Sequence, residues 1–294
     1  MISKVAFIGL GVMGYPMAGH LANDGLAVCV YNRTQAKAVQ WHAHYGGAWA
    51  NTPAAAVADA DIVFCCVGND NDLDSIALGT KGILAAMAPG SLLIDHTTAS
   101  AKVARKLALI ANKLGVDFMD APVSGGQAGA ENGVLTVMCG ADNSVFQRAK
   151  PVMSAYARTI THMGPVGHGQ LTKMVNQICI AGLLQGLAEG IAFAVNAGLN
   201  VSKMLEAIAP GAAGSWQLHN RGPTMLDNQF EFGFAVDLMR KDLAICLVEA
   251  GLNGSALPVT AMVDQFYSEL QAAGGGRLDT SSLLRRLPRR DLNG

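Results

Sequence analysis

Short apolar runs alternate with segments of helical periodicity over the first half of the chain. Such runs occupy residues 5–8, 27–31, 62–67, 91–95 and 134–140, and another ends at the proline-containing turn after residue 118. Apolar runs of this length, bounded by turn residues, are typical of strands buried on both faces of a parallel sheet. Strands that alternate with helices form βαβ units, so the sequence predicts an α/β, doubly wound parallel sheet.

The pattern changes over residues 169–197. This segment contains no proline, and apolar residues fall on nearly every face at helical period. Gly198 stands where a residue just past a helix end is expected, so we predict one helix of about 43 Å over 169–197. Because a helix that is apolar all round must be buried, it is expected to be the spine of a second, all-α domain. The predicted domains are residues 1–164 and 165–294.

Composition and charge narrow the class of protein. Of the 294 residues, 51% are hydrophobic and 15% are charged, which predicts extensive burial and a homodimer or homotetramer. The net charge of −1 gives no reason to expect nucleic acid or an anionic membrane as a partner. Six cysteines without C-x-x-C spacing predict reduced thiols in a cytoplasmic protein, and no metal-ligand cluster appears. The immediate first strand predicts no signal peptide, and polar residues interrupt the longest candidate membrane span.

A glycine-rich turn follows the first apolar run. Its glycines have the G-x-G-x-x-G spacing between a strand and a helix that binds dinucleotides. The first glycine permits the tight turn, the second lets the backbone approach a pyrophosphate, and the third lets the helix pack on the strand. The alternative is a turn that only packs. We predict that the cofactor site includes Gly9, Leu10, Gly11, Val12, Met13 and Gly14.

The end of the second strand indicates which dinucleotide is bound. An NAD site usually has Asp or Glu there to bind the ribose hydroxyls, whereas this chain has Asn32, Arg33 and Thr34. A carboxylate would repel a 2′-phosphate, while Arg33 can bind one through charge-assisted hydrogen bonds. We therefore predict NADP rather than NAD, the alternative being a solvated arginine. Later strand ends place Gly68, Asp72 and Thr98 near the cofactor, although these residue types also form ordinary turns.

Two further segments carry candidate substrate groups. Ser124 precedes Gly125 and Gly126, and such a turn exposes N–H groups beside a hydroxyl, which suits a carboxylate or carbonyl oxygen unless it is a plain loop. Trp216, expected in a loop, lines either the substrate pocket or a core or interface surface.

The long helix carries three polar side chains near its start. Lys173, Asn176 and Gln177 are spaced i, i+3 and i+4, so they share one face. A lysine beside two amides is a candidate general acid/base, the alternative being an exposed surface lysine.

These segments together resemble the β-hydroxyacid dehydrogenase family, which includes 3-hydroxyisobutyrate dehydrogenases, tartronate semialdehyde reductases and glyoxylate/succinic semialdehyde reductases. The resemblance covers nearly the whole chain and extends, more distantly, to 6-phosphogluconate dehydrogenase. Its four motifs are the opening signature Phe7–His20, the substrate turn Asp120–Gly126, the catalytic helix Gly169–Gln177 and the late lysine segment Leu238–Leu243.

The resemblance implies an NADP-dependent oxidoreductase that interconverts a short 3-hydroxy acid and its semialdehyde, with Lys173 as general acid/base aided by Asn176 and Ser124. The implied substrate contacts are Ser124, Gly125, Gly126, Asn176, Gln177, Trp216 and Lys241. The implied cofactor contacts beyond the glycine turn and residues 32–34 are Val67, Gly68, Asp72, Thr98 and Lys241.

Two departures from the family pattern affect this assignment. Asn176 and Gln177 replace a common Asn-Asn pair, so either amide could contact substrate, and Val67-Gly68 replaces a common Leu-Pro. The alternatives are a reductase of a non-carboxylate substrate such as an imine, and a non-enzymatic NADP-binding sensor. The retained Lys173 argues against the imine-reducing branch.

Overall fold

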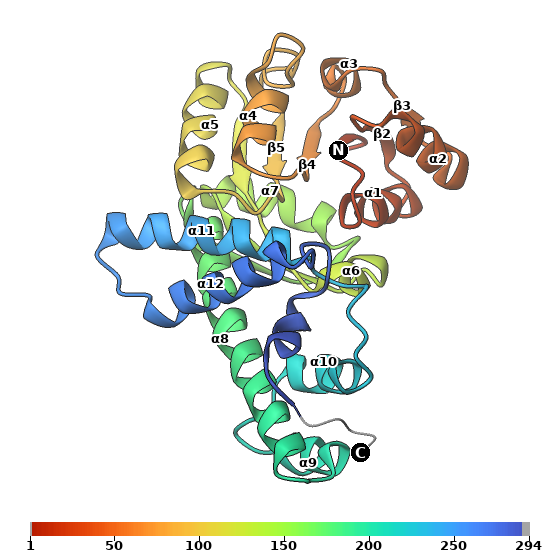
Figure 1. Cartoon of the computed structure of the whole chain (residues 1–294). Coiled ribbons are helices and arrows are strands. Elements are labelled where there is room, and N and C mark those ends of the chain that lie inside the picture. Colours follow the sequence, from red (N-terminus) through yellow and green to blue (C-terminus); the bar gives the residue numbers. More distant parts are fainter. Residues whose placement is uncertain (1, 290–294) are drawn as a thin grey trace. The chain divides into compact units, whose positions relative to one another are not determined.

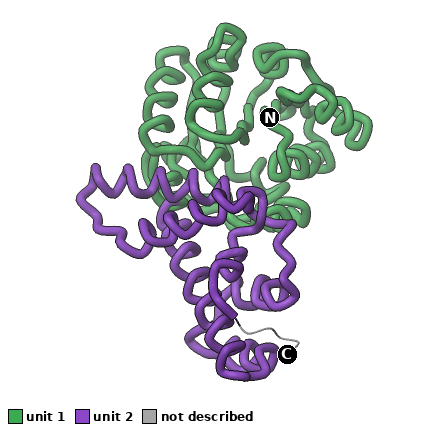
Figure 2. The backbone as a smooth tube through the Cα atoms, viewed as in Figure 1, with its two compact units in different colours: residues 1–173 green, residues 174–294 purple. Residues whose placement is uncertain are grey.

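The computed structural model describes residues 2–289 of the chain. It divides into two compact units, Met1–Lys173 (unit 1) and Met174–Gly294 (unit 2), shown in different colours in Figure 2. The division falls within helix α8 (His168–Asn196). The boundary that the sequence places after residue 164 stays a prediction.

Unit 1 is built on one sheet (Figure 1). Its strands are β1 (Lys4–Ile8), β2 (Ala27–Tyr31), β3 (Ala48–Trp49), β4 (Ile62–Cys65), β5 (Leu92–Asp95), β6 (Asp117–Asp120), β7 (Val123–Ser124), β8 (Leu135–Gly140) and β9 (Ala157–Gly164). The strand order is β3-β2-β1-β4-β5-β6-β8-β7, and β9 pairs with β8. All pairs from β3 to β6 are parallel, which confirms the predicted doubly wound sheet.

The far edge of the sheet departs from the parallel pattern. Strand β8 runs antiparallel to β6 and to the two-residue strand β7. Neither β7 nor this reversal of direction is evident in the sequence pattern. Short strands of this kind leave no distinct periodicity, and their direction is set by a partner strand elsewhere in the chain.

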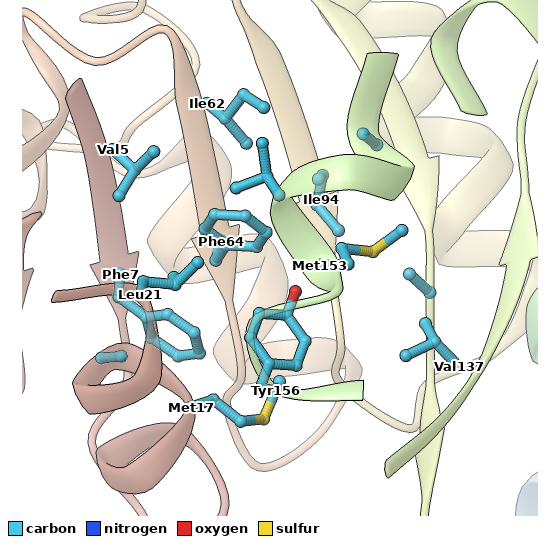
Figure 3. Packing of buried hydrophobic residues seen from close by; sticks show 14 of the residues in the cluster. Val5, Phe7, Met17, Leu21, Ile62, Phe64, Ile94, Val137, Met153 and Tyr156 are labelled. Carbon is cyan, nitrogen blue, oxygen red and sulfur yellow. The ribbon is translucent and has the colours of Figure 1, made fainter. Parts of the chain in front are cut away.

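Helices cover both faces of this sheet. They are α1 (Gly14–Asn23), α2 (Gln35–Tyr45), α3 (Pro53–Val57), α4 (Asp70–Leu78), α5 (Ala101–Lys113), α6 (Gly126–Glu131) and α7 (Asn143–Met153). Alternate residues of β1 enter two different cores, since successive side chains of a strand point to opposite faces. Phe7 packs in one core with Met17 and Tyr156 (Figure 3), and Ile8 packs in the other.

Unit 2 consists of the remainder of α8 followed by α9 (Val201–Ile208), α10 (Trp216–Leu226), α11 (Val236–Asn253), α12 (Pro258–Ala272) and a short 3₁₀ helix, η1 (Thr280–Arg286). This confirms the expected all-α second region. The long helix lies within one residue of its predicted bounds. Apolar side chains of α8 to α12 and η1 share a single core.

The described part of the basic segment Arg285–Arg289 near the C-terminus packs on unit 2. Arg286 pairs with Glu269 of α12, and its guanidinium lies 4.0 Å from the centre of the Phe266 ring. Arg290 lies outside the described residues.

Helix α8 is not buried all round within a single chain, contrary to the expectation from its sequence. Val175, Leu183 and Phe193 expose 59%, 38% and 72% of their surface, and their helical angles place them on one stripe. By length and composition α8 could cross a membrane, a test that core helices of soluble proteins also pass. It carries the buried polar side chains Lys173, Gln177 and Gln185.

Candidate active site

The glycine turn joins β1 to α1, and its three glycines meet different constraints. Gly9 has a φ of +100°, and a Cβ there would lie 2.2 Å from the Cys66 carbonyl oxygen. A Cβ on Gly14 would lie 2.0 Å from the Gly9 carbonyl oxygen. A Cβ on Gly11 would meet nothing within 4 Å. Packing therefore accounts for Gly9 and Gly14 but not for Gly11, which borders open space.

This open space fits a dinucleotide phosphate. It lies at the start of α1, where the N-cap residue Met13 makes no side-chain capping hydrogen bond. A helix N-terminus offers N–H groups and a favourable dipole to an anion. The strand order also reverses at β1, and ligands of open α/β sheets bind at such switch points.

The residues after β2 are partly engaged within unit 1. The Asn32 side-chain oxygen accepts a hydrogen bond from the Leu10 N–H at 2.9 Å, and its amide donates to the Thr34 carbonyl at 3.0 Å. Asn32 therefore ties the end of β2 to the glycine turn. The side chain of Arg33 is 88% exposed and lies 3.6 Å from a carboxylate oxygen of Asp72, near the start of α4. The structure thus brings together Arg33 and Asp72, two of the predicted cofactor residues.

The loop after β4 is bonded to the loop after β5. The Val67 N–H donates to the Thr97 hydroxyl at 3.0 Å, and the Thr97 N–H donates to Asp95 at 3.0 Å. Gly68 lies beside Asp72, since a Cβ there would be 2.5 Å from its carboxylate. Burial raises the pKa of Asp95 to about 7.

The Ser124 turn ends β7 and begins α6. Gly125 and Gly126 have φ values of +132° and +61°, a region in which side chains other than glycine are strained. Both glycines are exposed and Ser124 is half-buried. The turn therefore depends on its glycines and presents backbone groups at the surface.

Lys173 lies on α8 and is buried, which contradicts the alternative of an exposed surface lysine. The helix begins against the end of β6. There, the buried Asp120 carboxylate accepts hydrogen bonds from the N–H groups of Gly167 at 2.7 Å and Gln170 at 2.8 Å. Burial raises the pKa of Asp120 to about 6, although these two N–H groups lower it.

In unit 2, three candidate residues form one polar network. Asn176 donates to the side-chain oxygen of Gln177 at 2.7 Å, and Gln177 donates to Asp242 at 2.7 Å. Lys241 lies 3.0 Å from the other oxygen of the same carboxylate. Gln177 and Asp242 are buried, whereas Asn176 is half-buried. Both ends of the Gln177 amide are thus used inside unit 2.

Trp216 is not in a loop, which corrects the prediction from the sequence. It is the first residue of α10, because Ser215 caps that helix by accepting the Leu218 N–H at 3.0 Å. The residue is 54% exposed, and its ring centre lies 5.0 Å from the Arg221 guanidinium carbon. Trp216 is not among the buried residues of the unit 2 core. Ser215, a residue type favoured at helix N-caps, is the local signal for this helix start.

Four further residues belong to these polar networks but were not singled out from the sequence: Asp95, Asp120, Gln170 and Asp242. Asp95 and Asp120 each end a buried strand, and a carboxylate in that position was an available signal. Gln170 and Asp242 gave no local signal, since their partners lie far away in the chain.

Comparisons with known proteins identify the class. The family described as the NAD binding domain of 6-phosphogluconate dehydrogenase matches residues 4–164. The family described as the NAD-binding of NADP-dependent 3-hydroxyisobutyrate dehydrogenase matches residues 167–287. An uncharacterized oxidoreductase of Shewanella frigidimarina is 62% identical, and the match covers 97% of this chain and 98% of that protein.

Two relatives have more specific names. The 2-(hydroxymethyl)glutarate dehydrogenase of Eubacterium barkeri is 36% identical over 96% of this chain and 94% of its own. A solved structure of Mycobacterium tuberculosis 3-hydroxyisobutyrate dehydrogenase with L-serine is 30% identical, with a TM-score of 0.88 over 98% of this chain and 99% of that chain.

The fold and these matches define an NAD(P)-dependent oxidoreductase. More particularly, the chain belongs to the β-hydroxyacid dehydrogenase family.

Proposed function

We propose that this protein is an NADP(H)-dependent oxidoreductase that interconverts a short 3-hydroxy acid and its semialdehyde. The observation that carries the proposal is the burial of Lys173 on α8. Lysine is rarely buried in proteins, because an ammonium group loses its hydration there. A buried amine is also the group whose proton affinity a protein can adjust for acid/base catalysis.

Residues of this chain carry out the proton transfer and bind the substrate. Lys173 gives a proton to the aldehyde oxygen during reduction and takes it from the alcohol in the reverse direction. The Ser124 hydroxyl and the N–H groups at Gly125 and Gly126 hold the substrate carboxylate. A bound nicotinamide supplies or accepts the hydride.

Between the two amides, we assign the substrate contact to Asn176. The Gln177 amide is already bonded to Asn176 and Asp242 and is buried. Gln177 thus orients Asn176, and Asp242 in turn orients Lys241, which we place beside the cofactor and substrate. Trp216 stays a candidate pocket residue, since its ring is exposed.

We propose NADP rather than NAD as the cofactor. The pyrophosphate would lie on the turn of Gly9, Leu10, Gly11, Val12, Met13 and Gly14, with Val67, Gly68, Asp72 and Thr98 along the cofactor. Arg33 keeps most of its guanidinium exposed despite its Asp72 contact, so it is accessible to a 2′-phosphate. Asn32 contributes by fixing the turn, and Thr34 offers a hydroxyl at the start of α2.

The names of the relatives suggest the substrate class. 3-Hydroxyisobutyrate, 2-(hydroxymethyl)glutarate and L-serine are all 3-hydroxypropionates that carry a substituent on carbon 2. They share a primary alcohol one carbon away from the carbon that bears the carboxylate. We propose that this protein acts on a member of this class.

The direct test follows the loss of NADPH absorbance with glyoxylate and with succinic, methylmalonic and tartronic semialdehydes, each repeated with NADH. We expect turnover of methylmalonic or tartronic semialdehyde, whose products are 2-substituted 3-hydroxypropionates, faster with NADPH, and no turnover of matched aldehydes that lack the carboxylate. Turnover of glyoxylate or succinic semialdehyde alone would give a 2-hydroxy or a 4-hydroxy acid and would refute the proposed substrate class. Equal turnover of the non-acid aldehydes, or turnover of imines alone, would favour a non-carboxylate reductase. Tight NADPH binding with no turnover would favour a sensor.

We also propose that the protein self-associates through unit 2 and acts in the cytoplasm. Val175, Leu183 and Phe193 form an exposed stripe on α8, and Leu183 also lines an apolar hollow of about 230 Å³ formed by α8, α9 and the start of α10. Light scattering after size exclusion should give a dimer or tetramer, and Phe193→Asp should shift it toward monomer. The matched change of an exposed side chain on α5, Leu109→Asp, should not. A wild-type monomer at micromolar concentration would refute this assembly.

A further inference from the structure

Gln170 joins the first turn of α8 to the loop that follows β5. Its side chain is fully buried. The side-chain oxygen accepts a hydrogen bond from the Ala99 N–H at 3.1 Å, and the side-chain amide donates to the Thr97 carbonyl at 2.7 Å. One amide thus satisfies a donor and an acceptor two residues apart on the same backbone segment, and so fixes both position and orientation of residues 97–99.

The backbone of the same residue is fixed from the other side. Asp120, at the end of β6, accepts the N–H groups of Gly167 and Gln170. The backbone packs tightly here, because a Cβ on Gly169 would lie 2.4 Å from the Met138 carbonyl oxygen and 2.8 Å from the Asp120 carboxylate. The first turn of α8 therefore has little freedom to slide along the sheet.

The bonded path continues to the cofactor loops that the sequence predicted. Thr97 accepts the Val67 N–H through its hydroxyl, and Thr98 lies between the two backbone groups that Gln170 holds. In the other direction Lys173 is three residues from Gln170 on α8, about one turn or 4.5 Å along the axis.

We propose that Gln170 is a positioning residue that holds Lys173 in register with the loops at residues 67 and 97–99. This inference rests on the proposed function, in which Lys173 handles the proton and those loops line the cofactor. Gln170 itself touches neither reactant. Its contribution is to the geometry of proton transfer, where a displacement of about 1 Å can cost a factor of about 100 in rate.

The test compares Gln170→Leu with Gln185→Leu, a matched change of a buried glutamine on the same helix, fifteen residues further on. We expect Gln170→Leu to lower kcat about 10- to 100-fold, with the semialdehyde KM changed less than about threefold. Its Tm should stay within a few degrees of that of Gln185→Leu. Equal kcat values in the two variants, or a loss of kcat that follows loss of folded protein, would overturn the proposal.

Gln170→Glu supplies a rescue. A protonated carboxyl has the donor and acceptor of the native amide, whereas a carboxylate cannot donate to the Thr97 carbonyl. We expect kcat relative to wild type to recover as the pH is lowered from 8 to 6, and no such recovery in Gln170→Leu. The ratio to wild type cancels the titration of the other ionisable groups around this position, because both proteins have them. They are Cys65 on β4, Asp70 on α4, Asp95 and His96 on and after β5, Asp120 on β6, Cys139 on β8, Arg105 on α5, and His168 and Lys173 on α8. A flat ratio across this pH range would count against the proposal.

Amide hydrogen exchange separates this proposal from the proposed function. Residues 97–99 and the first turn of α8 should exchange at least tenfold faster in Gln170→Leu than in wild type or Gln185→Leu. Unchanged exchange rates would overturn the positioning role of Gln170 even if the enzyme is active. A wild type without turnover on any semialdehyde would refute the proposed function. The hydrogen-exchange result would still decide whether Gln170 fixes the first turn of α8 against residues 97–99.

Discussion

Two alanine substitutions in the glycine turn should separate folding from cofactor binding. Gly11→Ala adds a methyl group into open space, since nothing lies within 4 Å of a Cβ there. Gly14→Ala adds the same group 2.0 Å from the Gly9 carbonyl oxygen and 2.9 Å from the Phe7 ring. One chemical change is thus made in two environments three residues apart.

The expected sizes follow from these contacts. Overpacking costs about 1–3 kcal/mol and occasionally more, so Gly14→Ala should lower the Tm by roughly 2–12 °C. Gly11→Ala should leave the Tm unchanged or slightly higher, because alanine reduces the entropy of the unfolded chain. If the pyrophosphate binds over Gly11, the methyl group removes about one charge-assisted hydrogen bond, worth roughly 1.5–3 kcal/mol. NADPH affinity should then fall about 10- to 100-fold.

Thermal unfolding without cofactor and fluorescence titration with NADPH measure the two effects. Gly251→Ala, on α11 and also with nothing within 4 Å, is the control. It should leave the NADPH affinity unchanged and the Tm unchanged or slightly higher, because alanine is favoured over glycine in a helix. If Gly11→Ala binds NADPH as tightly as the wild type does, the pyrophosphate does not bind at this turn. A lowered Tm in the same variant would refute the inference that the methyl group meets open space.

Three other variants test the charges of the site. Arg33→Ala should lower the affinity for NADPH about 10- to 100-fold and the affinity for NADH much less, whereas the control Arg158→Ala on β9 should change neither. An equal loss of affinity for both cofactors would reject the 2′-phosphate role of Arg33. Lys173→Met should lower turnover by about two orders of magnitude while the exposed Lys203→Ala does not, and near-normal turnover of the first would remove Lys173 from the mechanism. Burial raises the pKa of Asp95 from 3.8 to about 7, so its stabilising contribution is complete below the unfolded pKa and is lost as the pH rises through the folded one. In urea unfolding, the free energy of unfolding of the wild type should therefore fall by roughly 3 kcal/mol more than that of Asp95→Asn between pH 5 and pH 8. An equal change in both proteins would show that Asp95 is not held as a neutral acid.

The sequence determined those features whose cause is local. Apolar runs and the intervening helical periodicity predicted the parallel strands, because strands buried on both faces are continuously apolar, whereas the buried side chains of the covering helices recur with a period of 3.6. The glycine spacing marked the β1–α1 turn, where φ and close packing admit only glycine at two positions. The absence of proline and the glycine at 198 gave α8 within one residue.

Only the tertiary structure decided the features that depend on distant partners. The burial of Lys173 and the raised pKa values of Asp95 and Asp120 come from neighbours on other elements, which no local pattern specifies. Gln170 has its partners 71 and 73 residues earlier in the chain. The strand β7 is two residues long and exists because β8 pairs with it. The sequence thus determined the conformations that each segment can adopt alone, whereas packing determined which polar groups lose water and which hydrogen bonds replace it.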